Sequence, residues 1–151
     1  MQVVVQRVTS AAVTVDGEIV GRIGPGLLAL VGIAEGDGDE QLQWMAAKVA
    51  KLRIFNDADG RFDRSVVDVG GELLSVSQFT LLGDVSKGTR PSFTKAADPD
   101  MAKAAWMRFN GLVAEHGIPV ATGVFGANMQ VELVNDGPVT ILLERSASEP
   151  A

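Results

Sequence analysis

The sequence predicts an α+β fold. Strand-like runs occupy the first third, the middle and the end of the chain, and two segments with helical spacing lie between them. The 151 residues contain no repeat, low-complexity tract or linker, which favours one domain with one core. The chain has no cysteine, so it offers no disulfide, no thiolate nucleophile and no cysteine-based zinc site.

The first third alternates between apolar and polar residues, as half-buried strands do. A hairpin turn is expected at Asp16-Gly17, because Asp-Gly favours tight turns between strands. The expected strands are Val3–Val8, Ala11–Val15, Glu18–Ile23 and Leu27–Ile33.

The first helix is predicted over Asp39–Leu52, where apolar residues recur at helical spacing. The acidic turn Phe55–Gly60 follows and resembles a fragment of a calcium loop. It lacks the closing bidentate glutamate, and Arg61 and Arg64 lie beside it. We therefore expect a hairpin connection at this point.

The second helix is predicted from about Pro99 to His116, with Asp98 as its N-cap and Gly117 at its end. His116 is the only histidine and so the only side chain whose ordinary pKa suits general-base work at neutral pH. Its place at a helix C-terminus favours a structural role instead. The remaining strands are expected at Val120–Phe125, Met129–Val134 and Val139–Leu143.

Two short motifs carry most of the functional information. Ser77–Leu81 closes the strand-like run Glu72–Leu82, and Gln78 and Thr80 place polar groups on a strand face that had been apolar. Asn135–Thr140 contains Gly-Pro between two apolar runs. Composition alone predicts a plain turn there, although the cis form of an X-Pro bond costs only about 0.5–1 kcal/mol.

Together, these motifs resemble the D-aminoacyl-tRNA deacylase family. The resemblance covers residues 1–144 in the family's order, and Arg145–Ala151 is expected to be a disordered tail. Further matching segments are Val5–Thr9, Gly24–Leu28, Arg53–Phe55, Arg90–Phe93 and Asn128–Asn135.

The resemblance implies a mainly antiparallel β-barrel with two packed helices, assembled as a homodimer with active sites at the interface. Strand counting alone also allows an open sheet covered by two helices. The implied reaction is hydrolysis of the ester bond of D-aminoacyl-tRNA, and of glycyl-tRNA mischarged on tRNA-Ala, with the 2′-OH of the terminal adenosine assisting. The implied catalytic residues are Ser77, Gln78, Phe79 and Thr80, with the N–H groups of Phe79 and Thr80 as candidate oxyanion donors.

Chiral selection is implied for Gly137-Pro138, which in cis form enters the partner subunit's site and excludes L-aminoacyl-tRNA. Arg7 is expected to steady this loop, and Phe125 and Met129 to line the adenosine pocket. The alternatives are a surface charge for Arg7 and core positions for the two apolar residues.

The formal net charge of −6 limits the expected RNA contact to the tRNA 3′ end. Lys87, Arg90 and Lys95 are candidates to receive its phosphates. No cofactor, metal, DNA or membrane partner is expected. The longest apolar run, Leu27–Ile33, is too short to span a bilayer, and we expect a cytoplasmic protein.

Two other function classes stay open. One is a small-ester hydrolase with Thr80 as nucleophile, although the sequence shows no activating partner for this hydroxyl. The other is a non-catalytic β-barrel that binds single-stranded RNA or a metabolite. The aromatic content of two Trp, six Phe and no Tyr disfavours an RNA-stacking surface.

Overall fold

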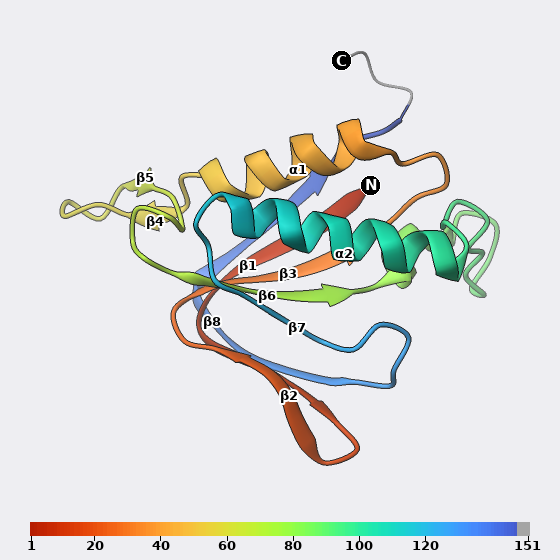
Figure 1. Ribbon diagram of the computed structural model, residues 1–151, viewed down its shortest axis with the longest axis horizontal. Coiled ribbons are helices and arrows are strands. Elements are labelled where there is room, and N and C mark those ends of the chain that lie inside the picture. Colours follow the sequence, from red (N-terminus) through yellow and green to blue (C-terminus); the bar gives the residue numbers. More distant parts are fainter. Residues whose placement is uncertain (148–151) are drawn as a thin grey trace.

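The structure, a computed structural model, describes residues 1–147 and contains a curled sheet with two long helices (Figure 1). Residues 148–151 of the expected tail lie outside the described part. The elements in chain order are β1 Gln2–Val15, β2 Glu18–Ile23, β3 Gly26–Gly32, α1 Asp39–Lys51, β4 Phe55–Asn56, β5 Phe62–Arg64, β6 Glu72–Ser77, a 3-10 helix Phe79–Leu82, α2 Pro99–Glu115, β7 Val120–Thr122 and β8 Gln130–Glu144.

The main sheet has the strand order β2-β1-β3-β6-β7, and β8 also pairs with β1. The pairings of β1 with β2, β3 and β8 are antiparallel, whereas β3–β6 and β6–β7 are parallel. The edge strands β2 and β7 approach each other at Gly21, where a Cβ would lie 2.4 Å from the Thr122 carbonyl oxygen. The sheet is therefore a nearly closed, mainly antiparallel barrel, which confirms the expected fold class.

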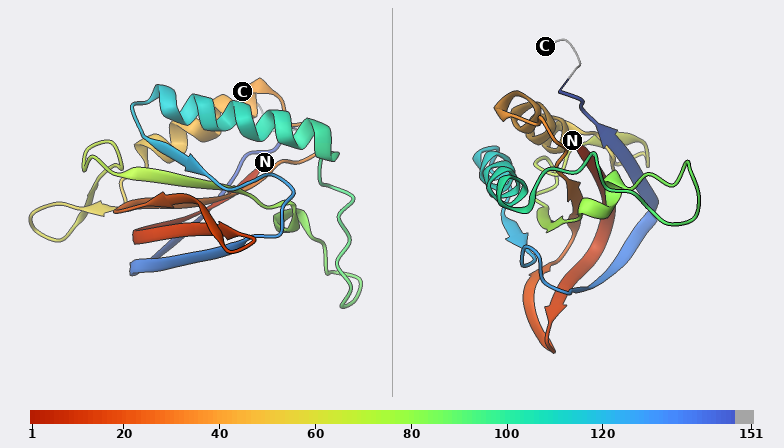
Figure 2. Two further views of the ribbon diagram at one scale, coloured as in Figure 1. Left: turned by 60° about the horizontal axis from the view of Figure 1, so that its bottom comes forward. Right: turned by 90° about the vertical axis from the view of Figure 1, so that its right-hand side faces the viewer.

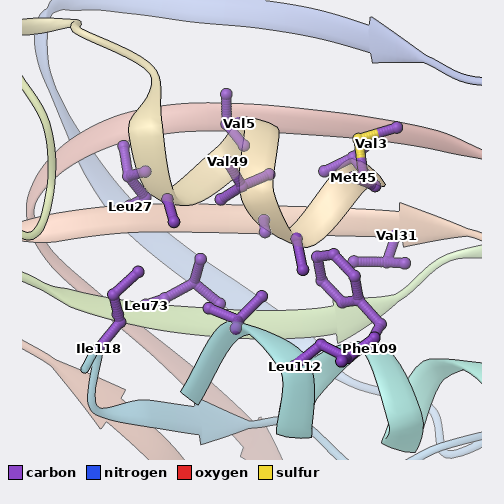
Figure 3. Packing of buried hydrophobic residues seen from close by; sticks show 14 of the residues in the cluster. Val3, Val5, Leu27, Val31, Met45, Val49, Leu73, Phe109, Leu112 and Ile118 are labelled. Atoms are coloured by element: carbon purple, nitrogen blue, oxygen red, sulfur yellow. The ribbon is translucent and has the colours of Figure 1, made fainter. Parts of the chain in front are cut away.

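Both helices lie side by side on one face of the curled sheet (Figures 1 and 2). The main core forms between them and the strands, and Met45, Val49 and Phe109 from the helices meet Val3 and Val31 from the sheet (Figure 3). A second apolar cluster, including Val13, Leu28 and Leu74, fills the inside of the curl. These two clusters fix the strands that carry the candidate site.

The helix ends agree with the sequence prediction. The Asp98 carboxylate accepts hydrogen bonds from the N–H groups of Asp100 and Met101, as an N-cap does. His116 is the C-cap residue of α2, and its N–H donates to the carbonyl oxygen of Val113 at 3.0 Å. No helix among residues 1–147 is long and apolar enough to cross a membrane.

The long strands differ from the prediction. β1 is one strand of 14 residues rather than two, because its first half pairs with β3 and its second half with β2. β8 is also continuous and runs through the Gly-Pro step. In contrast, β7 ends at Thr122, before the expected end at Phe125.

The predicted hairpin after α1 is confirmed as β4–β5. The Asp57 carboxylate accepts hydrogen bonds from the N–H groups of Asp59 and Arg61, at 2.8 and 2.9 Å. The acidic side chain thus stabilises the turn itself.

Candidate active site

The Ser77–Leu82 segment is not a continuous strand, which corrects the sequence prediction. The N–H of Gln78 donates to the Val31 carbonyl at 2.7 Å, and β3 ends one residue later. The chain then has no strand ahead of it to extend the ladder and folds into the 3-10 helix, where the Leu81 N–H donates to the Gln78 carbonyl at 3.3 Å. The N–H groups of Phe79 and Thr80 precede this first helical hydrogen bond.

Thr80 lies exposed at the start of the 3-10 helix. Its Oγ1 accepts a hydrogen bond from Nε2 of Gln78 at 3.0 Å. An amide N–H is a donor and cannot take a proton from a hydroxyl group, so this contact does not activate Thr80 as a nucleophile. The geometry suits the orientation of a polar group better than covalent catalysis.

An apolar cavity of about 370 Å³ opens beside this segment. Phe79 and Phe93 meet edge to face at its wall, with ring centroids 5.0 Å apart and planes at 67°. A cavity of this size with aromatic walls suits a flat ring system such as a nucleobase. The residues that line it are Ile33, Ser77, Phe79, Phe93, Ala96, Ala97, Pro99, Ala102, Phe125 and Gly126.

The Phe125 wall is supported from behind by Trp106 and Ser75. The Phe125 and Trp106 rings lie 6.0 Å apart, and the buried indole Nε1 donates to the Ser75 Oγ at 2.9 Å. The Ser75 carbonyl also accepts from the N–H of Gly123, at the start of the loop that carries Phe125. Ser75 therefore holds this wall through both its side chain and its backbone.

The Gly-Pro step forms a bulge in β8 rather than a turn between two strands. Opposite β1, Thr140 pairs with Gln6 and Asn135 with Val8, so the four residues 136–139 stand against Arg7 alone. The Gly137-Pro138 peptide bond is cis. Gly137 has φ 145°, and a Cβ on it would lie 2.8 Å from Val139 Cγ2 and 3.0 Å from Val139 N, so only glycine fits.

Arg7 is buried, with 7% of its surface exposed, and holds the bulge in place. Its Nε donates to the Asp136 carbonyl at 2.8 Å, and its Nη1 donates to the Ile54 carbonyl at 2.9 Å and to Asn56 Oδ1 at 3.2 Å. The interpretation of Arg7 as a surface charge is wrong. The expected contact between Arg7 and the Gly-Pro loop is present.

Asn135 is a residue of β8 that the sequence analysis did not assign to the site. Its Nδ2 donates to the Val139 carbonyl at 3.1 Å, and its Oδ1 accepts from the Val139 N–H at 2.7 Å. The side chain thus closes the base of the bulge. Its signal in the sequence was the Asn-Asp pair, which also fits an ordinary turn. Phe93, Ser75 and Trp106 were likewise not assigned.

Within one chain, the Gly-Pro bulge lies far from the pocket. Ser77 pairs with Val31 and Val31 with Val3, whereas Gly137 stands opposite Arg7, four residues further along β1. Four residues along a strand and three strand spacings across the sheet separate the two regions by roughly 20 Å. The subunit does not bring its own Gly137-Pro138 to its own Ser77–Thr80 segment.

The other candidate residues divide between the two ends of the molecule. Lys87, Arg90 and Lys95 are exposed on the loop before α2 (Figure 1, right). A hydrogen bond from Ser86, with a smaller effect of the Lys95 charge, lowers the pKa of Asp84 in the same loop. His116 lies at the far end of α2 from Pro99, about 25 Å away at 1.5 Å per residue.

Met129 is half-buried and packs against the second apolar cluster, outside the pocket lining. Its sulfur occupies the space beside Gly123, where a Cβ would lie 2.7 Å from it. A role for Met129 in the site stays a prediction.

The fold and these two regions define an α+β barrel protein with an apolar pocket and, apart from it, a backbone bulge held by a buried arginine. Residues 4–144 match the model of the family described as "D-Tyr-tRNA(Tyr) deacylase", and the chain belongs to this family. The expectation of an enzyme of the D-aminoacyl-tRNA deacylase class is thereby confirmed.

Relatives and solved structures agree with this assignment. The chain is 56% identical to the D-aminoacyl-tRNA deacylase of Desulfitobacterium hafniense (strain DSM 10664 / DCB-2), over 95% of this chain and 97% of the relative. It is 55% identical to that of Deinococcus radiodurans, over 95% and 99%. A solved structure titled "c-Myc DNA Unwinding Element Binding Protein" superposes with a TM-score of 0.91 at 42% identity, over 97% and 99% of the two chains.

Proposed function

We propose that the protein hydrolyses the ester bond of D-aminoacyl-tRNA and releases the free D-amino acid and tRNA, as chiral proofreading in translation quality control. Glycyl-tRNA mischarged on tRNA-Ala is a second substrate. The observation that carries this proposal is the apolar cavity of about 370 Å³, which Ser77 and Phe79 of the candidate segment help to line, in a chain of this family. We place the activity in the cytoplasm, where aminoacyl-tRNA is used.

In this proposal the terminal adenine lies in the pocket among Phe79, Phe93 and Phe125. The ester then lies at the mouth, beside the N–H groups of Phe79 and Thr80. These donors stabilise the oxyanion that forms when water attacks the ester carbonyl. The exposed Lys87, Arg90 and Lys95 receive the neighbouring phosphates of the tRNA 3′ end.

The chemistry needs little activation from the protein. An aminoacyl ester is already reactive, because its carbonyl lies beside an ammonium group and the 2′-OH of the terminal adenosine can assist. Alignment of ester, water and donors contributes several kcal/mol, on the order of 7–11 in the best intramolecular reactions. This agrees with a site in which Thr80 accepts a hydrogen bond from Gln78 and His116 lies at the far end of α2.

Chiral selection comes from the Gly137-Pro138 carbonyl groups of the partner subunit. They accept hydrogen bonds from the substrate's α-ammonium and leave room for a hydrogen, but not for an L side chain. The separation of roughly 20 Å within one chain supports the assignment to the partner.

An apolar strip, exposed at Leu142 and half-buried at Val4 and Leu30, supports a two-fold homodimer. Leu142 of β8 is 78% exposed, and it stands in register with Val4 of β1, which in turn pairs with Leu30 of β3. This strip lies between the pocket and the Gly-Pro bulge. A two-fold axis midway between these regions exchanges them, so that each bulge meets the other subunit's pocket.

The test of the function is hydrolysis of matched glycyl-, D-alanyl- and L-alanyl-tRNA. We expect rapid cleavage of the D-alanyl ester, cleavage of the glycyl ester and refusal of the L-alanyl ester. Refusal of the glycyl ester would show that the site demands a side-chain contact, which contradicts exclusion by backbone. Binding of all three without cleavage would favour a non-catalytic RNA-binding protein.

The test of the shared site is subunit mixing. One variant carries a defective Ser77–Thr80 segment and the other a defective Gly137-Pro138 loop. Recovery of activity in the heterodimer is the expected result. No recovery, with subunit exchange confirmed, would show that each subunit is self-contained.

A further inference from the structure

The outer side of α1 carries a basic concavity that the proposed active site does not use. Trp44, Lys48 and Lys51 lie one helical turn apart along this side, and Arg53 follows the helix. Together they line a hollow of about 360 Å³ with Ala47 and Leu52. None of these six lining residues is acidic. We call the four residues Trp44, Lys48, Lys51 and Arg53 the α1 basic face.

The charge of this face contrasts with that of the whole chain, whose formal net charge is −6. Lys48, Lys51 and Arg53 are exposed, and the Arg53 side chain is 69% accessible. Its ion pair with Asp63, at 3.3 Å, is open to solvent and therefore weak. A phosphate group can replace this carboxylate at little cost, so the face is available to a polyanion.

Trp44 positions one cation of this face, Lys48. The Lys48 ammonium lies 5.1 Å from the centre of its ring, and the Arg145 guanidinium also lies 5.1 Å from it. These cation–π contacts hold Lys48 against the helix instead of leaving it to extend freely. A row of cations along one side of a helix fits the row of charges on the backbone of a nucleic-acid helix.

The Arg53 end of the α1 basic face is linked to the Gly-Pro bulge, and none of the four residues lines the subunit's own pocket. Arg53 precedes Ile54, whose carbonyl accepts a hydrogen bond from Arg7. Arg7 also binds the carbonyl of Asp136, the residue before Gly137. One buried arginine therefore ties the face to the loop that, in the proposed function, enters the partner's site.

We propose that the α1 basic face contacts phosphates of the acceptor stem of a tRNA whose 3′ end occupies the partner subunit's pocket. This inference rests on the proposed function and on its two-fold dimer. Each tRNA is then held by both subunits: one receives the terminal adenosine, and the other supplies the selecting loop and grips the stem beside it.

The experiment compares the Lys51→Ala/Arg53→Ala double variant with wild-type protein. Both side chains are exposed, so the variant should fold normally, which thermal unfolding checks. The affinity for uncharged tRNA is measured between 50 and 200 mM KCl. Loss of two phosphate contacts should reduce the salt dependence, so that wild type loses about tenfold more affinity than the variant over this range. Arg22→Ala, exposed on β2, is the control and should retain the wild-type salt dependence.

A second substrate separates this inference from the proposed function. D-alanyl-adenosine carries the reacting ester but no stem, so the double variant should cleave it as fast as wild type while losing activity on D-alanyl-tRNA at 200 mM KCl. A salt dependence equal to wild type, or an equal change in Arg22→Ala, would overturn the stem contact. If wild type cleaves neither substrate, the proposed function itself is wrong, and the stem contact falls with it.

Discussion

Replacement of Arg7 by alanine tests whether the Gly-Pro bulge depends on a buried side chain. Arg7 donates to two backbone carbonyls, those of Asp136 and Ile54, and to the side chain of Asn56. Its guanidinium also lies 5.6 Å from the centre of the Phe62 ring. In Arg7→Ala both carbonyls lose their charged donor, and the bulge loses its link to the chain after α1.

The expected cost follows from these contacts. A buried acceptor left without its donor costs about 1–3 kcal/mol, and two such carbonyls cost about 2–6 kcal/mol. Water can reach the Asp136 side, because its carboxylate is 54% exposed, which favours the lower half of this range. A loss of about 2–4 kcal/mol corresponds to a fall in Tm of roughly 5–15 °C for a chain of this size.

The assay is urea unfolding together with cleavage of D-alanyl-tRNA. We expect the free energy of unfolding of Arg7→Lys to lie between those of wild type and Arg7→Ala. Lysine keeps the positive charge, but it lacks the rigid fork of donors that lets arginine reach three acceptors. Arg22→Ala, at an exposed arginine, should change stability by less than about 0.5 kcal/mol. A loss in Arg7→Ala no larger than in this control would refute the argument that Arg7 holds the bulge.

Three further predictions concern other parts of the molecule. Thr80→Ala should keep substantial D-aminoacyl-tRNA cleavage, whereas a tRNA ending in 2′-deoxyadenosine should be cut far more slowly; a trapped acyl-Thr80 intermediate would contradict this. Ser75→Ala removes the acceptor of the buried Trp106 N–H and should lower the free energy of unfolding in urea by about 1–3 kcal/mol. The KM for D-aminoacyl-tRNA should rise more than kcat falls, and an unchanged KM would leave the serine a purely stabilising role. A hydrogen bond from Arg108 lowers the pKa of Asp39, so its contribution to stability is present above the unfolded pKa of 3.8 and is lost as pH falls through the lowered value. Asp39→Asn should therefore be less stable than wild type at pH 7 and equal to it in strong acid, and a difference that persists in acid would refute the pairing.

The helices were predictable almost to the residue, because their signals are local. Asp98 and Gly117 mark the limits of α2 in the sequence itself, and apolar spacing marks α1. The end of β6 was not predictable, because apolar residues typical of strands continue at Phe79, Leu81 and Leu82. It stops at Ser77 only because its neighbour β3 ends there. That information lies in the pairing and not in the local sequence.

The candidate site likewise contains residues that the sequence could indicate and residues that only the fold brings there. The family motifs pointed to Ser77–Thr80, Gly137-Pro138 and Arg7 as candidates from residue type and order, and their role in the site stays a prediction. They did not identify Trp106, which contacts the pocket wall from another element. Nor did composition distinguish a turn at Asn135–Val139 from a bulge inside a strand. The difference depends on β1, which pairs with β8 on both sides of this segment.

The continuity of β8 has a consequence for how substrates are compared. A flap that closes over a ligand is joined to the body by hinges, and it adjusts to what it meets. The Gly-Pro bulge has its two ends fixed in the same ladder, its base closed by Asn135 and its outer carbonyl held by Arg7. If the bulge selects substrates as proposed, it does so as a rigid element: an amino acid either fits the space beside it or does not. Discrimination between mirror images needs such stiffness. D- and L-amino acids differ only in the side of Cα that carries the side chain, and a flexible element would move aside and accept both.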